Sequence, residues 1–151
     1  MGMDVHGLNP VIRKEPTSEI LKEDWTKLSE DDLGKYFEAK QQQEEDNPGI
    51  YFRNNVWWWR PLWDFTCYHV GCLTDTDHEQ GHFNSGHEIS KNKAEQIALT
   101  LKELLEGGEA DLYKAWYENE TKDDDYEYPF HVDNVKAFAE FCKDSGGFSI
   151  Q

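Results

Sequence analysis

Three consecutive tryptophans, Trp57 to Trp59, restrict what this chain can fold into more than any other feature of its sequence. Neighbouring side chains alternate across a strand and spread around a helix, so three adjacent indoles cannot all face one core. We therefore expect at least one of them to be partly exposed or to line a cleft. Pro61 follows closely, and proline is tolerated best in the first turn of a helix. The sequence accordingly predicts a helix that begins near Arg60 and runs to about Cys72.

The wider pattern predicts an α+β fold that is predominantly α-helical and forms one domain over residues 1–151. The length is that of a single domain, and aromatic residues make up 14% of the chain, which argues against disorder. Apolar residues at helical spacing predict four to six helices, with candidates at about 18–28, 30–46, 60–72, 90–106, 109–118 and 133–145. Three segments resemble short strands, and we expect them to pair into one small sheet: 3–8, 50–53 and 148–150.

Two of these segments carry more specific expectations. Ser29 precedes three acidic residues and is a typical N-cap, and the helix after it is expected to bury Leu33, Tyr36 and Phe37. Asp133 or Asn134 is expected to cap the last helix. Residues 74–88 and 121–129 are polar and show no periodicity, so both are interpreted as loops.

The formal net charge of −16 limits the classes of partner. Such a field repels nucleic acid and anionic membrane, and the basic surface that binds phosphate backbones is lacking. No stretch approaches the ~20 apolar residues of a membrane span. The three cysteines are an odd number and no secretory signal precedes them, which favours free thiols in a reducing cytoplasm. We expect a cytoplasmic protein that contacts neither nucleic acid nor membrane directly.

The tryptophan segment is the predicted ligand site. Residues 50–108 hold 8 acids and 5 bases, against 12 and 6 before them and 11 and 4 after them, and two of the three arginines flank the tryptophans. Indoles stack on planar rings, and a guanidinium holds phosphate in a fork. The alternative is that the tryptophans form the core and the arginines pair with acids. The ligand-binding candidates for a nucleotide-like anion are Arg53, Asn54, Asn55, Trp57, Trp58, Trp59, Arg60 and Trp63.

A second group of residues offers metal ligands. His78, His82 and His87 are the candidates, and the first two are four residues apart, which suits one face of a helix. A carboxylate from Asp75, Asp77 or Glu88 would complete a zinc site. The spacing matches no established ligand motif, so a loop with merely polar histidines is the favoured interpretation. A nucleophilic Cys67 or Cys72 beside a histidine is a further option. The alternative, which is favoured, is that both cysteines are small buried hydrophobic residues.

Three stretches, at 1–5, 51–63 and 145–148, together resemble a group of small proteins encoded by bacteriophages, prophages and bacteria. The resemblance covers the two termini and residues 50–108. Relative to shorter members, the acidic segment 17–47 looks like a helical insertion. The resemblance implies a phage setting, and with it a role in countering host defence, by association only.

These observations favour a non-enzymatic binding protein, without catalytic residues or cofactor, that sequesters a nucleotide-like host signalling molecule. Two alternatives come from other classes. One is an acidic inhibitor that mimics nucleic-acid charge on a host protein, and the other is a metal-dependent hydrolase using the histidine-rich segment. A homo-oligomer is also open, since an aromatic surface serves equally as a protein interface.

Overall fold

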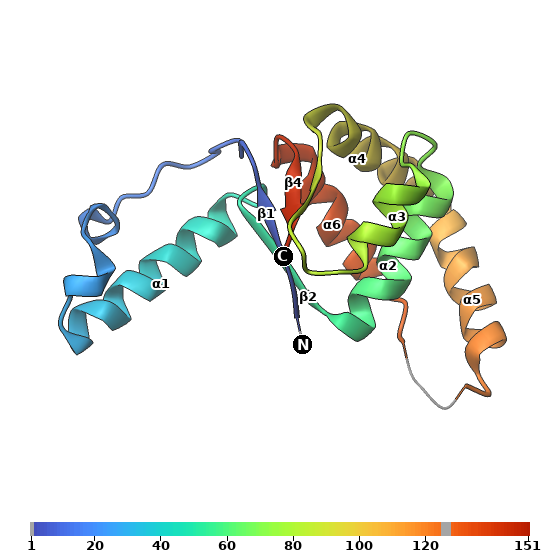
Figure 1. The fold of residues 1–151 in the computed structure, drawn as a ribbon, viewed down its shortest axis with the longest axis horizontal. Helices are drawn as coiled ribbons and strands as arrows, with labels where there is room; N and C mark the ends of the chain where they lie inside the picture. The colour runs from blue at the N-terminus through green and yellow to red at the C-terminus, as the bar shows by residue number, and fades with distance from the viewer. Residues whose placement is uncertain (1, 125–127) are drawn as a thin grey trace.

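A four-stranded antiparallel sheet organises the chain in the computed structural model, which describes residues 2–124 and 128–151. The strand order is β2-β1-β4-β3, so the strands nearest the two chain ends lie side by side at the centre (Figure 1). The strands are β1 (Gly2–Gly7), β2 (Tyr51–Asn55), β3 (His87–Ile89) and β4 (Phe148–Ile150). The predicted α+β class and the pairing of the three expected strands are confirmed.

Three helices build the core together with the sheet: α2 (Val56–His69), α4 (Lys91–Glu106) and α6 (Val132–Asp144). Met3 and Val5 alternate with polar neighbours along β1 and are fully buried, so one face of this strand supplies the core. The contact between α4 and α6 is the most extensive in the molecule, and α5 (Glu109–Thr121) packs outside it. Ser90 caps α4 as its spacing predicts.

Helix α2 begins four residues earlier than predicted, so Pro61 lies inside it. The Asn55 side chain accepts a hydrogen bond from the Trp58 backbone N–H at 2.8 Å and starts the helix. An interior proline removes one backbone hydrogen bond. Here Pro61 is itself buried, and the burial of Trp59, Leu62 and Trp63 offsets that loss.

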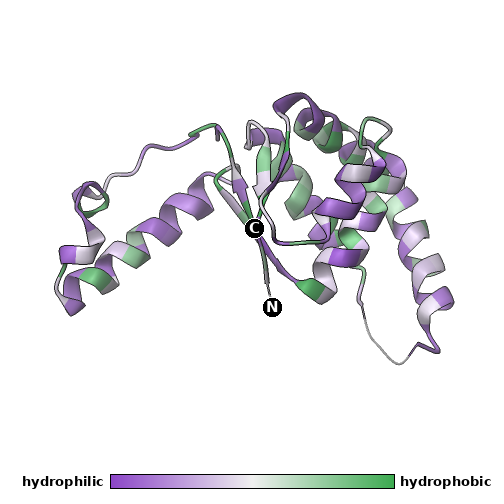
Figure 2. Cartoon of the chain, in the orientation of Figure 1, coloured by the Kyte–Doolittle hydropathy of each residue, from purple (hydrophilic) through white to green (hydrophobic). Residues whose placement is uncertain are grey.

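An arm made of residues 15–46 stands away from this body (Figure 1). It holds α1 (Glu30–Asp46) and two 3-10 turns, η1 (Glu19–Lys22) and η2 (Trp25–Lys27), in place of the helix predicted at 18–28. Ser29 caps α1 as predicted. The expected burial of Leu33, Tyr36 and Phe37 is wrong, because no residue of α1 is buried and no surface of the body lies opposite them. Most of α1 is hydrophilic (Figure 2).

Asn47 closes the base of the arm. Its side-chain oxygen accepts hydrogen bonds from the backbone N–H groups of Arg13 and Lys14 at 2.7 and 2.9 Å. Its amide group donates to the backbone carbonyl of Lys14 at 3.0 Å and to that of Gln43. Asn47 is fully buried, so the two ends of the arm are tied together by one satisfied side chain.

Segment 74–88 is not the predicted loop, because it contains the helix α3 (Asp75–Gly81) and the edge strand β3. Thr74 and Asp77 form a capping box that starts α3. The expected cap of the last helix at Asp133 or Asn134 is wrong, because both residues lie inside α6; His131 holds the N-cap position, and its side chain makes no capping hydrogen bond. The predicted loop at 121–129 lies partly outside the described residues. Within the described ranges, none of the helices has the length and apolar character that crossing a bilayer requires.

Candidate metal centre

Two buried tryptophans of α2 hold the short helix α3 in place. The indole N–H of Trp59 donates to the backbone carbonyl of Gly81 at 2.7 Å. The indole N–H of Trp63 is shared between the carbonyls of Asp77 and His78, at 3.3 and 3.1 Å. The two rings stack on each other with centroids 5.3 Å apart. The carbonyls at the end of a helix need partners, so the indoles fix both the position and the orientation of α3.

This contact brings three metal-ligand side chains together. Asp64 follows Trp63 on α2, and His78 and His82 come from the helix that Trp63 holds. Both histidine Nε2 atoms lie 2.7 Å from Asp64 Oδ1. All three ligand atoms fall within 4.8 Å of one another. Because an ionised carboxylate only accepts hydrogen bonds, both imidazoles donate to it as the structure stands.

The arrangement fits one divalent transition metal ion. Zinc bonds of about 2.0–2.2 Å in a tetrahedral site separate neighbouring ligand atoms by roughly 3.3 Å. Each histidine would therefore move by about 0.6 Å from Asp64, which small side-chain rotations supply. His82 Nδ1 is buried without a partner among the described residues, so Nε2 is the ring nitrogen open to a ligand. Asp64 and His78 are half exposed, which leaves the remaining coordination positions facing solvent.

The charges around the three ligands are arranged to keep the carboxylates ionised. Burial raises the pKa of Asp64, but hydrogen bonds from His82 and His78 outweigh it and hold that pKa below its usual value. Asp77 belongs to α3 and is buried. Burial raises its pKa too, yet bonds from Lys93, the Thr74 backbone and His87 hold it well below the ordinary range.

Among the predicted metal ligands, His78 and His82 come together and His87 does not. The His87 Nε2 atom lies 2.8 Å from Asp77 Oδ1, where it supports the start of α3. The carboxylate that joins the pair is Asp64, which sequence reasoning missed. None of Asp75, Asp77 and Glu88 joins the ligand set found among the described residues. Asp64 is the only acidic residue of α2, and its place in an otherwise mainly apolar helix, next to Trp63, was the sequence signal that could have marked it as a ligand.

The structure separates the predicted nucleotide-binding residues into buried and exposed sets. Trp59 and Trp63 are fully buried. Asn54 exchanges two hydrogen bonds with Asn134, at 3.0 and 2.8 Å, in the interior. Asn55 caps α2. Asn55 is exposed, but its side chain is engaged in that cap, so these four residues serve packing and helix placement in the described structure.

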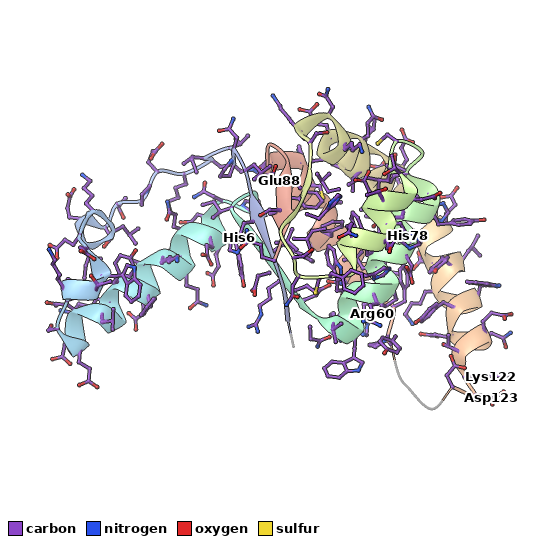
Figure 3. The ribbon with its side chains drawn as sticks, in the orientation of Figure 1. His6, Arg60, His78, Glu88, Lys122 and Asp123 are labelled. Atoms are coloured by element: carbon purple, nitrogen blue, oxygen red, sulfur yellow. The ribbon has the colours of Figure 1, made fainter. Side chains whose placement is uncertain are left out.

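The exposed set comprises Arg53, Trp57, Trp58 and Arg60. Arg53 lies on β2 and pairs with Asp4 at 3.5 Å. Trp58 is 36% exposed and stacks on His131, with ring centroids 4.2 Å apart. Trp57 is 46% exposed. Arg60, labelled on α2 in Figure 3, has no ion pair within residues 2–124 and 128–151. In the sequence it lies one helical turn before Asp64.

Cys67 and Cys142 lack the lowered pKa of a nucleophilic thiol. Burial, followed by the charges of Asp64 and Asp77, raises the pKa of Cys67 far above its usual value. Burial does the same for Cys142. Cys72 is exposed. A thiol needs a lowered pKa to act as a nucleophile at neutral pH, so the cysteine alternative lacks support.

A separate groove of about 640 Å³ lies between α4 and α6. Its floor is apolar and its rim carries charges of both signs. The lining residues are Glu95, Ala98, Leu99, Lys102, Leu105, Glu106, Val132, Lys136, Ala139, Glu140 and Lys143. The volume suits a small molecule, but no cluster of catalytic or ligating groups accompanies it.

No family model, no curated protein and no solved structure matches the chain.

Proposed function

We propose that the chain is a metal-dependent hydrolase that binds one divalent transition metal ion, zinc being the best fit, through Asp64, His78 and His82. The observation that carries this proposal is the meeting of two imidazole nitrogens and one carboxylate oxygen from two helices. The surrounding core supports it, since buried indoles fix α3 against α2. Preorganised ligands on rigid elements are what a metal site requires.

Three protein ligands are typical of catalytic rather than structural zinc sites, because they leave a position for water. Bound to such an ion, water loses a proton near neutral pH and becomes a nucleophile. The half-exposed Asp64 and His78 leave that position open to a substrate. Hydrolysis is therefore the reaction class that this set of ligands supports best.

Metal content is the first test. Protein purified without a histidine tag, stripped with chelator and titrated with zinc in a calorimeter should bind one equivalent. His78→Gln and Asp64→Asn should each weaken binding by at least the roughly 10–100-fold that losing a supporting contact costs. His6→Gln is the matched control, since His6 lies on β1 away from the site. Zinc binding that is absent, or equal in His78→Gln and His6→Gln, would sink the proposal.

Hydrolysis is tested separately with p-nitrophenyl acetate, a generic activated ester. The zinc-loaded protein should release p-nitrophenolate faster than the stripped protein, and Asp64→Asn should remove the difference. Equal rates with and without zinc would leave a metal-binding protein and refute the hydrolase.

The earlier hypotheses of a nucleotide-sequestering protein and of an acidic charge mimic stay predictions, as does the phage setting. The charge mimic rests on the net charge of −16 alone, and it predicts partner binding that weakens steeply with salt.

A further inference from the structure

The exposed edge of α2 carries a line of side chains that leads to the three ligands. Trp57, Arg60, Asp64 and Tyr68 follow one another at intervals of three or four residues, so they share one face of the helix. All four are exposed, whereas Trp59, Leu62 and Trp63 on the other face are buried. The edge therefore combines an indole, a guanidinium and a metal ligand in one row.

Arg60 is the cation nearest to Asp64 along this row. Residues four apart on a helix have Cβ atoms about 5–6 Å apart. The hydrogen bond from Trp59 to Gly81 places the end of α3, and with it His82, beside the same turn of α2. Figure 3 shows Arg60 on α2 and His78 on the adjoining α3. Arg60 is thus positioned to reach a group bound at the three ligands.

The guanidinium of Arg60 also forms no ion pair with the described residues. The chain has 31 acidic residues, and Arg13 and Arg53 both pair with carboxylates. Among the described residues Arg60 pairs with none, although Asp64 lies one turn away. An unpaired arginine beside a metal site is suited to a bidentate grip on phosphate. A net charge of −16 repels anions at long range, so a phosphorylated substrate needs these local positive groups.

We propose that the substrate is a nucleotide-like phosphate ester, with its phosphate held between the metal position and Arg60 and its planar ring on Trp57. This inference rests on the proposed function. Trp57 lies about 10 Å from Asp64 along the helix axis, from a rise of 1.5 Å per residue, with Arg60 between them. An exposed indole stacks on a nucleobase without discriminating between the different bases.

The reaction is the hydrolysis of one phosphate ester bond. Asp64, His78 and His82 would hold the ion, which would supply an activated water. The oxygen of that water would form a bond to phosphorus while the bond between phosphorus and the ester oxygen breaks. One proton of the water ends on the leaving alcohol. Arg60 stabilises the charge that spreads over the phosphoryl oxygens. Neither an oxidant nor a second substrate takes part.

Binding to the zinc-loaded protein tests the substrate class. AMP, GMP, UMP, 3′,5′-cyclic AMP and ADP-ribose are titrated by calorimetry, with adenosine and inorganic phosphate as truncated probes. At least one nucleotide should bind more than tenfold tighter than both truncated probes, and zinc removal should abolish that difference. Hydrolysis of the ester bond is followed by phosphorus NMR, as release of inorganic phosphate from AMP, GMP or UMP or as opening of the cyclic AMP ring; ADP-ribose serves as a binding probe only.

Matched variants locate the two contacts. Arg60→Gln should weaken nucleotide binding at least tenfold and leave zinc stoichiometry unchanged, whereas Arg53→Gln, which alters the other exposed arginine of this region, should change neither. Trp57→Ala should weaken nucleotide binding more than phosphate binding. Trp58→Ala is its control, because that ring stacks on His131.

The outcomes separate this inference from the proposed function. Absence of zinc binding removes both. One equivalent of zinc with no nucleotide binding refutes the substrate class alone. Nucleotide binding that does not need zinc, or equal losses in Arg60→Gln and Arg53→Gln, also overturns it.

Discussion

Replacing Gly81 by alanine tests whether the close contact between α2 and α3 builds the metal site. A Cβ at Gly81 would lie 2.1 Å from Trp63 Nε1 and 2.3 Å from Trp63 Cε2. Ordinary van der Waals contact begins at 3.4 Å, so the two groups must separate by about 1.3 Å. Gly81 has a negative φ, because it is not among the glycines with a positive one. The substitution therefore probes packing and not backbone strain.

The helix has to move, because the indole cannot. Trp63 is fully buried, stacks on Trp59 and meets Phe138 and Phe148 edge-on. A displacement of about 1.3 Å would stretch the Trp59 Nε1 to Gly81 O distance from 2.7 Å to as much as about 4.0 Å, beyond hydrogen-bond reach. Overpacking costs roughly 1–3 kcal/mol, and each lost hydrogen bond about 1 kcal/mol. We expect Gly81→Ala to lower the free energy of unfolding by about 2–4 kcal/mol.

Metal binding should suffer more than stability. Ligands have to stay within about 0.5 Å of the productive geometry, and the displaced helix carries both histidines. Zinc affinity measured by calorimetry should therefore fall below detection at a temperature where urea unfolding, followed by tryptophan fluorescence, still shows a folded protein.

Gly34→Ala is the matched control. Gly34 lies inside α1 with nothing within 4 Å of its added Cβ, and alanine in a helix interior gains roughly 0.5–1 kcal/mol over glycine. The same methyl group should thus destabilise at one site and stabilise at the other. If Gly81→Ala keeps both the stability and the zinc affinity of the unchanged protein, the role assigned to this contact is wrong.

Three further predictions concern the body of the molecule. Asp77→Asn should cost about 2–3 kcal/mol at pH 7, less than for a fully buried pair because Lys93 is partly exposed. The bonds to Asp77 lower the pKa of its carboxyl group in the folded state, so the stability that the carboxylate contributes is present above about pH 4 and is lost as the pH falls further. Urea unfolding at pH 7, 5 and 3.5 should therefore show a free energy of unfolding that depends less on pH in Asp77→Asn than in the unchanged protein. Parallel pH dependences of the two proteins would contradict this. Asn134→Ala should cost about 1–3 kcal/mol by leaving the Asn54 side-chain oxygen buried without its donor, with the double alanine variant costing less than the sum of the single ones. Strict additivity in that double-mutant cycle would count against a coupled pair. A thiol reagent should modify the exposed Cys72 quickly and the buried Cys142 only after unfolding, and fast loss of all three thiols from the native protein would refute the burial of Cys142.

The sequence predicted those features whose stability is local or periodic. Strand patterns at both ends, the Ser29 and Ser90 caps and the apolar face of α4 each follow from nearby residues, and the structure has them. Helix α3 was not predicted from the sequence, because its carbonyls accept hydrogen bonds from indoles 14–22 residues away, and no local pattern reveals such a contact. The reverse happened in α1, where Leu33, Tyr36 and Phe37 keep helical spacing and α1 packs on η1, yet none of the three is buried.

The candidate site was predictable only in part. The interval between His78 and His82 indicated two ligands on one helical face, and that spacing is found on α3. The third ligand depends on how α2 packs against α3, which sequence alone did not supply. The tryptophan motif was interpreted as a ligand surface or as core, and the structure divides it: Trp59 and Trp63 are buried, while Trp57 remains on the exposed edge beside Arg60.

Because the hydrogen bonds of Asn47 join the two ends of the arm, the stability of the body should depend little on how long the arm is. Because one side chain joins residues 13–14 to 47, folding of the body has to close the intervening stretch only as a loop. Loop-closure entropy rises so slowly that doubling such a stretch costs only about 0.6 kcal/mol. The junction at Asn47 is therefore a suitable site for replacing the arm: it can be shortened, exchanged or replaced by a reporter domain while the helices that carry the three ligands keep their places.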